Sequence, residues 1–250
     1  TAGYTYAWTP PVSNTNCIYG MPPGSYTIAV TDANGCITTA TDVIQGYMIN
    51  ATLNTTNTNC NSVCWSSDLG MFLGVGLGII IKSNDGYIWD YINVTSNNWS
   101  SVCWSPKLNI FVAVSNTTTG SNNEIMIITY QNSTINYSYY NSSNDTNAWS
   151  SICWAQEINL FVAVSANGTN RVMTSKNGIN WTGYQSSNEN NGWSSVCWSP
   201  LLSMFTAVAT NGTNKIMYSY NGINWKSGTS PNQNNIWQNV IWCPELLIFI

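Results

Sequence analysis

The side chains that could perform catalysis are few in this chain of 250 residues. It contains no histidine, which excludes Ser-His-Asp and Cys-His nucleophilic catalysis within these residues. A carboxylate pair for glycoside cleavage remains available in principle. The ten acidic residues are Asp32, Asp42, Asp68, Asp85, Asp90, Glu124, Asp145, Glu157, Glu189 and Glu245. Most of them fall in expected turns or loops and none recurs as a pair, so we expect a protein that is not an enzyme.

Charge also limits the ligands that the chain could bind. Only 6% of the residues are charged and the net charge is −4, whereas nucleic-acid binding needs clustered Lys and Arg. The single arginine, Arg171, lies on an expected strand, where we interpret it as a solvated residue. There is no phosphate loop or dinucleotide fingerprint, and the apolar run 70–81 is short and broken by glycines. We therefore expect no cofactor, no nucleic-acid partner and no membrane insertion.

The cysteines divide into groups by position. One recurs at the same place in each of four sequence repeats, and we expect these to be small buried residues with unpaired thiols: Cys64, Cys103, Cys153 and Cys197. The lack of histidine and of C-x-x-C spacing argues against a metal ring. Cys60 and Cys243 break the pattern and could pair if the first and fifth repeats adjoin. Cys17 and Cys36 fit a disulfide better.

The elements that position these residues come from an internal repeat. A segment of the type W-S-S-[V/I]-C-W begins its copies at Cys60, Trp99, Trp149, Trp193 and Trp237, and the second tryptophan of each copy is Trp65, Trp104, Trp154, Trp198 or Trp242. A period of roughly 40–50 residues made of short strands is typical of propeller blades. The copy from Trp193 shows the expected pattern of four antiparallel strands, which are 194–198, 204–210, 215–220 and a last one starting at 223.

The sequence thus predicts an all-β fold, a β-propeller of four-stranded antiparallel blades that is incomplete in this chain. It occupies 60–250, with four copies and the start of a fifth, and the S-S-V-C-W segments are its innermost strands. Blades stacked around an axis would bury the sheet faces that a single sheet leaves open.

A motif of the type S-x-[D/N]-G-x-x-W marks the third turn of three copies. Its residues are Ser83, Asp85, Gly86 and Trp89, then Ser175, Asn177, Gly178 and Trp181, and then Ser219, Asn221, Gly222 and Trp225. This motif resembles the Asp-box of BNR-type repeats, shortened by one residue, which is known from sialidases and many non-enzymatic propellers. The resemblance implies a local turn staple, in which the Asx side chain bonds backbone amides and the tryptophan packs under the neighbouring sheet. The copy from Trp99 lacks the motif at 131–137.

Residues 1–45 differ from the repeats. The run P-G-x-Y-T…V-T-D-x-N-G-C resembles the SprB repeat, an immunoglobulin-like or PKD-like β-sandwich module of secreted adhesins, through Trp8, Pro10, Pro23, Gly24, Tyr26, Thr27, Val30, Thr31, Asp32, Asn34, Gly35 and Cys36. Only the C-terminal half of such a module is present. We expect strands at 26–30 and 37–44, a polar connector at 46–59, and a chain that is processed or partial.

Acceptor sites for N-linked glycans are dense. The N-x-[S/T] positions are Asn50, Asn54, Asn93, Asn98, Asn116, Asn132, Asn136, Asn141, Asn144, Asn167, Asn180 and Asn211. Some arise by chance in a chain rich in Asn, Ser and Thr, but several fall in expected loops, where attachment is sterically possible.

Together these features predict a non-catalytic extracellular structural or adhesion module. It would form part of a surface fibre or filament of a cell or virion, with neighbouring modules or other copies as partners. The W-S-x-V-C-W-S-P repeats also resemble those of surface proteins of large DNA viruses and of some bacteria. One alternative is a propeller that binds glycans or a host receptor through Tyr137–Tyr140 and Tyr184. A more remote one is a glycoside hydrolase of sialidase-like fold, although a sialidase needs an arginine triad.

Overall fold

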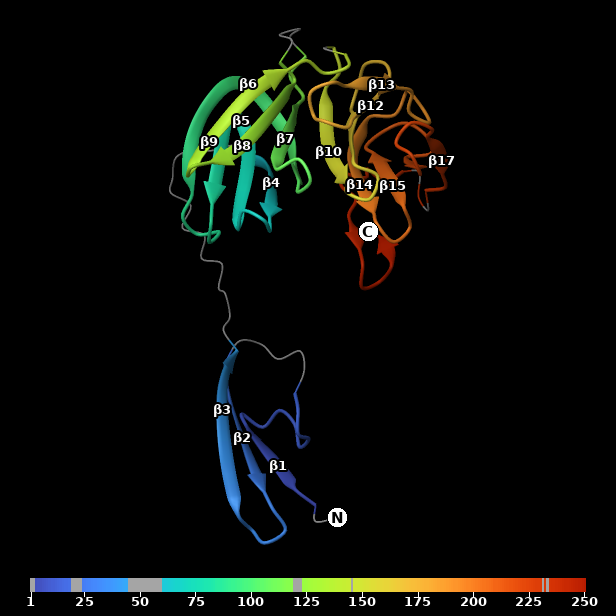
Figure 1. The fold of residues 1–250 in the computed structure, drawn as a ribbon. Coiled ribbons are helices and arrows are strands. Elements are labelled where there is room, and N and C mark those ends of the chain that lie inside the picture. The colour runs from blue at the N-terminus through green and yellow to red at the C-terminus, as the bar shows by residue number, and fades with distance from the viewer. Residues whose placement is uncertain are drawn as a thin grey trace. The chain divides into compact units, whose positions relative to one another are not determined.

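The computed structural model describes residues 3–18, 24–44, 60–118, 123–144, 146–230, 232 and 234–250. All the secondary-structure elements in these ranges are β-strands, which confirms the all-β class (Figure 1). The chain divides into two compact units, Thr1–Leu53 and Asn54–Ile250. The expected connector 46–59, with Asn50 and Asn54, lies outside the described residues.

The N-terminal unit contains one antiparallel sheet of three strands in the order β1-β2-β3. The strands are β1 (Thr5–Thr9), β2 (Gly24–Thr31) and β3 (Ile37–Ile44). The turn between β2 and β3 is fixed by Asp32, whose Oδ1 accepts hydrogen bonds from the amides of Asn34 at 2.9 Å and Cys36 at 2.8 Å. Such a side chain-to-backbone bond is the usual reason for aspartate in a turn.

The C-terminal unit is built from antiparallel sheets that follow the chain order. The first six strands form one sheet, made of β4 (Cys60–Ser66), β5 (Met71–Ser83), β6 (Asp90–Ser105), β7 (Ile110–Ser115), β8 (Ile125–Gln131) and β9 (Thr134–Tyr140). A four-stranded sheet follows, with β10 (Trp149–Ala155), β11 (Leu160–Ser165), β12 (Val172–Ser175) and β13 (Thr182–Tyr184). The next has β14 (Trp193–Ser199), β15 (Met204–Ala209), β16 (Ile216–Ser219) and β17 (Lys226–Gly228). A two-stranded sheet ends the unit, with β18 (Trp242–Cys243) and β19 (Ile248–Phe249).

We call the repeat units the first copy (60–98), second copy (99–148), third copy (149–192), fourth copy (193–236) and fifth copy (237–250). The third and fourth copies each form the expected four-stranded antiparallel sheet. The first and second copies share one six-stranded sheet, because β5 and β6 are long. The part of β6 up to Asn98 pairs with β5 and the part from Trp99 pairs with β7. The spacing between Trp65 and Trp104 is the shortest in the chain, so no loop separates the last strand of one copy from the first strand of the next.

The core lies between successive copies. Val162 and Val164 of the third copy pack in one cluster with Trp193, Val196 and Phe205 of the fourth. The two other clusters join the second copy to the first and third copies in the same way. The leading tryptophan of the second, third and fourth copies is 0% exposed. Because full burial of one large apolar side chain contributes roughly 1.5–3 kcal/mol, each sheet depends on its neighbour for much of its stability.

Candidate functional site

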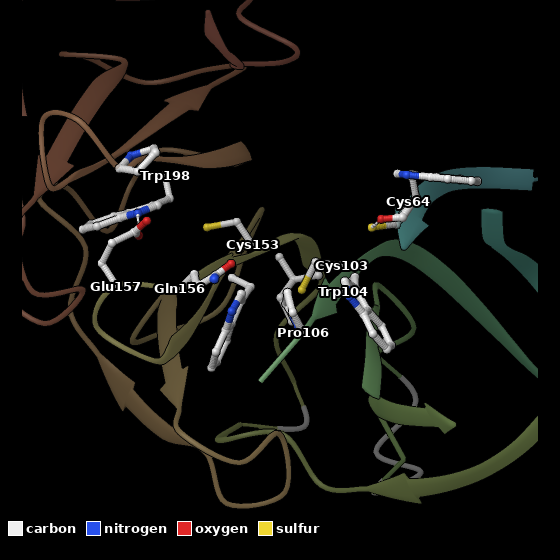
Figure 2. A pocket seen from close by; sticks show the side chains of 12 residues that line it. Cys64, Cys103, Trp104, Pro106, Cys153, Gln156, Glu157 and Trp198 are labelled. Atoms are coloured by element: carbon white, nitrogen blue, oxygen red, sulfur yellow. Dashed lines mark hydrogen bonds between the residues drawn. The ribbon is translucent and has the colours of Figure 1, made fainter. Parts of the chain in front are cut away.

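A groove of about 400 Å³ crosses the first strands of four successive copies and the turns that follow them. Figure 2 shows the thiols of Cys64, Cys103 and Cys153 one after another along it, with Glu157 beside Trp198 at one end. The three cysteines face Leu73, Val112 and Val162 of the paired second strands, so they hold one register position in three copies. The periodic sequence therefore repeats the same side chain along the groove.

The thiols of the groove are poor nucleophiles and poor metal ligands at neutral pH. Burial raises the pKa of Cys64 to about 11. Burial also holds the pKa of Cys103 and of Cys153 well above the ordinary value, and the neighbouring thiols Cys64 and Cys153 raise the pKa of Cys103 further. Because the thiolate is the reactive and metal-binding form, these residues act as small apolar side chains. In the described ranges no group of three or more His, Cys, Asp or Glu side chains is placed to hold a metal ion.

Indole and carboxylate groups supply the polar contacts of the groove. Trp104 donates its Nε1–H to Oδ2 of Asp68 at 3.1 Å, and Trp198 donates to Oε2 of Glu157 at 2.6 Å. In each pair the acid belongs to the preceding copy and occupies the third position after its repeat tryptophan. In the second copy this position is occupied by Lys107, so the copy before Trp154 offers no acid there. The buried Nε1 of Trp154 has no partner among the described residues. Glu157 is the only carboxylate that lines the groove in the described part of the chain.

The arginine of the chain lies at a loop instead of in the groove. Arg171 donates from Nε to the carbonyl of Gly168 at 3.0 Å and from Nη1 to the carbonyl of Asn191 at 2.6 Å. Lys215, at the same repeat position in the fourth copy, donates from Nζ to the carbonyl of Asn235 at 2.8 Å. Each cation therefore ties the loop before the third strand of its copy to the last loop of the same copy. This corrects the expectation that Arg171 is a solvated strand residue. Arg171 precedes β12, and its side chain is bound to two backbone carbonyls.

Two further acids have structural partners. Oε1 of Glu189 accepts hydrogen bonds from the amide and hydroxyl of Ser186 at 2.6 and 2.7 Å. Glu124 is fully buried and accepts a 3.4 Å bond from the amide of Ser142 through Oε2. These carboxylates belong to different copies, and neither of them lines the groove.

The three Asp-box-like turns share one hydrogen-bond pattern. In the fourth copy, Oγ of Ser219 accepts from the amide of Gly222 at 3.0 Å, and Oδ1 of Asn221 accepts from the amides of Ile223 and Asn224 at 3.0 and 2.9 Å. The same bonds recur around Ser175, Asn177 and Gly178, and around Ser83, Asp85 and Gly86. Each glycine has a positive φ, between 72° and 77°. The motif is thus a closed local turn, as its residue types imply.

The tryptophans of these turns are half-buried. Trp181 and Trp225 pack against the core clusters that join their copies to the preceding ones. Trp181 donates from Nε1 to the carbonyl of Gly178 at 2.8 Å and lies with its ring centroid 6.2 Å from that of Phe161, in its own copy; Trp89 and Trp225 do the same with their own glycines and phenylalanines. Gly178 makes the contact with the preceding copy, since a Cβ there would approach Val112 to 3.1 Å. Because the glycine and the tryptophan are three residues apart, the indole reaches the carbonyl of its own turn.

The second copy replaces this turn with a tighter one. Asn132 and Ser133 have φ values of 49° and 60°, and Gln131 pairs directly with Thr134. Two central residues with positive φ form the hairpin turn that suits twisted strands.

The predicted bridge between Cys17 and Cys36 is wrong for this structure. Cys36 is exposed, and the Cys17 thiol donates to Oδ1 of Asn16 at 3.3 Å. The register from Thr5↔Thr31 to Thr9↔Thr27 explains the separation. The segment that carries Cys17 leaves β1 at Thr9, whereas Cys36 follows the turn at the opposite end of the sheet. The suggested Cys60–Cys243 pair is not formed either.

The described glycan acceptor candidates fall into two groups. Asn98 and Asn144 are half-buried and donate through Nδ2 to Asn116 and Thr169. The others are exposed, namely Asn93, Asn116, Asn132, Asn136, Asn141, Asn167, Asn180 and Asn211. The side chains of Asn167 and Asn211 also accept bonds from the amides of Ala148 and Gly192 through Oδ1.

The serines of W-S-S are the functional residues that sequence reasoning missed. The second serine accepts from an amide of the next copy: Ser62 from Val102 at 3.2 Å, Ser101 from Ile152 at 3.2 Å, Ser151 from Val196 at 3.2 Å and Ser195 from Val240 at 3.1 Å. The first serine donates to the leading carbonyl of the next copy, as Ser150 does to Trp193 at 2.6 Å. The recurrence of the serine pair was the available signal, but its partners lie 40 or more residues away in the sequence. We call this arrangement the serine junction.

Comparisons with known proteins match the fold alone. No family model matches the chain, and no curated protein matches it. A chain in a crystal structure of the mitotic checkpoint complex is similar, with 12% identity and a TM-score of 0.54 over 91% of this chain and 68% of that one. Two structures of the extracellular domain of BT4673 from B. thetaiotaomicron are 11% and 12% identical, with TM-scores of 0.55 and 0.54 over 93% of this chain. This chain spans 32% of their length. No helix among the described residues is long and apolar enough to cross a membrane.

Proposed function

We propose that residues 60–250 form a β-propeller of four-stranded blades, incomplete in this chain, and that the chain is a non-catalytic structural or adhesive module of an extracellular surface fibre or filament. The observation that carries this proposal is the serine junction, which recurs between all five copies with hydrogen-bond lengths of 3.1–3.2 Å. A recurring junction of this kind stacks equivalent sheets in one direction, which suits an extended repeat assembly. The Asp-box-like turns and the SprB-like segment support the same interpretation.

The use of the polar side chains supports a role without catalysis. The cations Arg171 and Lys215 bind loop carbonyls, and the thiols of the groove are protonated at neutral pH. Glu157 holds an indole. A glycosidase needs two carboxyl groups on either side of one bond, and these acids serve separate structural sites.

The extracellular location rests on surface chemistry. Eight exposed sequons and a surface that is rich in uncharged polar residues suit a secreted glycoprotein. The location also agrees with the printed description of BT4673 as an extracellular domain, although that likeness is one of fold. A cell surface and a virion surface have the same chemical requirements.

Glycan binding is the second candidate. Tyr137 is 38% exposed and its ring centroid lies 5.7 Å from that of Tyr139 on β9, and adjacent aromatic rings can stack on sugars. A glycan array probed with the full chain tests this candidate. Saturable binding that is lost in Tyr137→Ser would favour it over the structural role.

Immunogold electron microscopy of intact source cells or particles tests the structural proposal. We expect gold label on outer surfaces, along fibres or filaments, without permeabilisation. Label that appears only after permeabilisation would contradict the proposal.

A further inference from the structure

A buried acid, Glu124, occupies a repeat position at which the next two copies carry a cation. The backbone carbonyl at this position accepts a hydrogen bond from the end of the second strand of its copy. The pairs are Glu124 with the amide of Ser115 at 2.9 Å, Arg171 with that of Ser165 at 2.9 Å and Lys215 with that of Ala209 at 3.0 Å. Each of the three residues stands immediately before the third strand of its copy. The charge of the side chain therefore changes sign while the backbone around it stays the same.

The side chains at this position all reach the last loop of their own copy. Arg171 donates to the carbonyl of Asn191 in that loop at 2.6 Å, and the fourth copy repeats this contact with its lysine. Glu124 reaches the last loop of the second copy, where its Oε2 accepts from the amide of Ser142 at 3.4 Å. An acid thus lies where the other copies use a cation to hold the loop.

The loop carbonyl that corresponds to the one bound by Arg171 is that of Asn147. Asn147 and Asn191 are held in the same way: both are 0% exposed, and the Nδ2 of each donates to a threonine carbonyl of the next copy, at 2.9 and 2.7 Å. Their amides close the same turn, with N–O distances of 3.3 and 3.2 Å. An ionised glutamate has no proton to donate, and no described residue donates to the carbonyl of Asn147.

The carboxylate of Glu124 also has an oxygen without a partner. Glu124 is 0% exposed, and no hydrogen-bond donor in the described part of the chain reaches its buried Oε1. A buried carboxylate is costly unless a cation or several hydrogen-bond donors compensate its charge. The second copy therefore places two acceptor oxygens, one of them charged, where the third and fourth copies place a cation against a carbonyl.

We propose that the carboxylate of Glu124 and the carbonyl of Asn147 bind a calcium ion, which joins the two loops of the second copy as Arg171 and Lys215 do in the next two copies. Glutamate ends one atom before lysine, so an ion can lie between its carboxylate and that carbonyl. Ligands that are all oxygen suit a hard cation. Ca²⁺ combines carboxylate, carbonyl and water oxygens in flexible geometry, whereas Mg²⁺ demands a near-ideal octahedron and gives up its water reluctantly. Because the site has a single acid, we expect a dissociation constant of about 10⁻⁴–10⁻³ M.

Thermal unfolding of the full chain, in CaCl₂ and in a chelator, tests the proposal. Ca²⁺ at ten times its dissociation constant should raise the unfolding midpoint of the C-terminal unit by about 3–6 °C. MgCl₂ at the same ionic strength should raise this midpoint by much less, which separates binding at the site from the screening of charges. An unchanged midpoint in CaCl₂, or an equal rise with the two salts, would overturn the proposal.

Two substitutions of Glu124 separate the ion from the fold. Glu124→Gln keeps the shape of the side chain and removes its charge, so calorimetric titration should show Ca²⁺ binding at least about tenfold weaker. Glu124→Lys carries the residue type of the fourth copy. It should abolish the response to Ca²⁺ and raise the midpoint in chelator above that of the unmodified chain. Asp42→Asn is the matched control, because it removes the same charge from an exposed acid of the N-terminal unit and should leave the response unchanged.

The midpoint of Glu124→Gln also distinguishes an ionised glutamate from one that is held as a neutral acid. If Glu124 is neutral, Glu124→Gln should have the midpoint of the unmodified chain both in CaCl₂ and in chelator. That result, or a Ca²⁺ response of the same size in Glu124→Gln and the unmodified chain, would contradict the calcium site.

Discussion

The indole Nε1 of Trp198 donates a 2.6 Å hydrogen bond to Oε2 of Glu157, so a tryptophan of one copy is held by a carboxylate of the copy before it. Trp104 and Asp68 form the same pair at the junction between the first and second copies. At the intervening junction, between the second and third copies, Lys107 stands in place of the acid. This natural variation along the chain allows each pair to serve as a control for the others.

Removal of the carboxylate at residue 157 should destabilise the junction between the third and fourth copies. Trp198 is 8% exposed, so Glu157→Ala leaves a nearly buried N–H without its acceptor. We expect a loss of about 1 kcal/mol in the free energy of unfolding, because Glu157 itself is exposed to solvent. Urea unfolding followed by tryptophan fluorescence measures the loss. Gln156→Ala, at the exposed neighbouring position, should change stability by much less; equal losses in the two variants would argue against the indole bond.

The reverse change should stabilise the chain at the neighbouring junction. Trp154 has a buried Nε1 without a described partner, and Lys107 stands where a carboxylate would accept a hydrogen bond from that N–H. Lys107→Glu should therefore add about 0.5–1.5 kcal/mol to the free energy of unfolding. Lys107→Gln separates the loss of positive charge from the gain of the carboxylate. An unchanged or lower unfolding midpoint in Lys107→Glu would be inconsistent with the pairing rule.

Local features could be predicted from the sequence, and long-range ones could not. The turns at Asn177-Gly178 and Asn221-Gly222 follow from residue types that favour positive φ, and their partners lie within three residues. The strands of the third and fourth copies follow from alternation and from those turns. Fusion of the first two copies into one sheet depends on a shortened connection, which the repeat motif does not record.

The site illustrates the same limit. The periodic cysteines indicated one equivalent position, but their arrangement along a groove depends on how the sheets stack. Ser151 and Val196 are 45 residues apart in sequence, so the serine junction is visible only once copies are placed side by side. The Cys17–Cys36 pairing failed for a related reason, because the strand register decides which end of a sheet a loop reaches.

The serine junction should contribute measurably to stability. Ser151→Ala removes the acceptor of the Val196 amide, which lies 3.2 Å from the hydroxyl oxygen. An amide left without a partner in this partly buried position should cost about 1–2 kcal/mol. Ser67→Ala is the matched control, since Ser67 is exposed and lies outside the junction. Thermal unfolding followed by circular dichroism compares the two variants. Identical unfolding midpoints would show that the Ser151 hydroxyl does not stabilise the junction between the copies.

The Asp85 turn should give the chain part of its acid sensitivity. The amides of Ile88 and Tyr87 and the hydroxyl of Ser83 donate to the carboxylate, which lowers the pKa of Asp85 below its ordinary value of 3.8. The stabilisation is therefore fully present above pH 3.8 and is lost as pH falls through the lower folded-state pKa. Asp85→Asn, which carries the residue of the other two turns, should flatten the fall of the melting temperature in this range. Asn177→Asp should steepen it, and the prediction fails if neither profile changes.

The central claim, that the polar residues of the repeats serve assembly instead of catalysis, is tested most directly by turnover. The purified full chain is incubated with sialosides and with a panel of other glycosides, and product is measured beside Glu157→Gln and Glu189→Gln. We expect no hydrolysis above the blank in any sample, with the substitutions altering only the unfolding midpoint. Hydrolysis by the unmodified chain that either substitution abolishes would contradict the account.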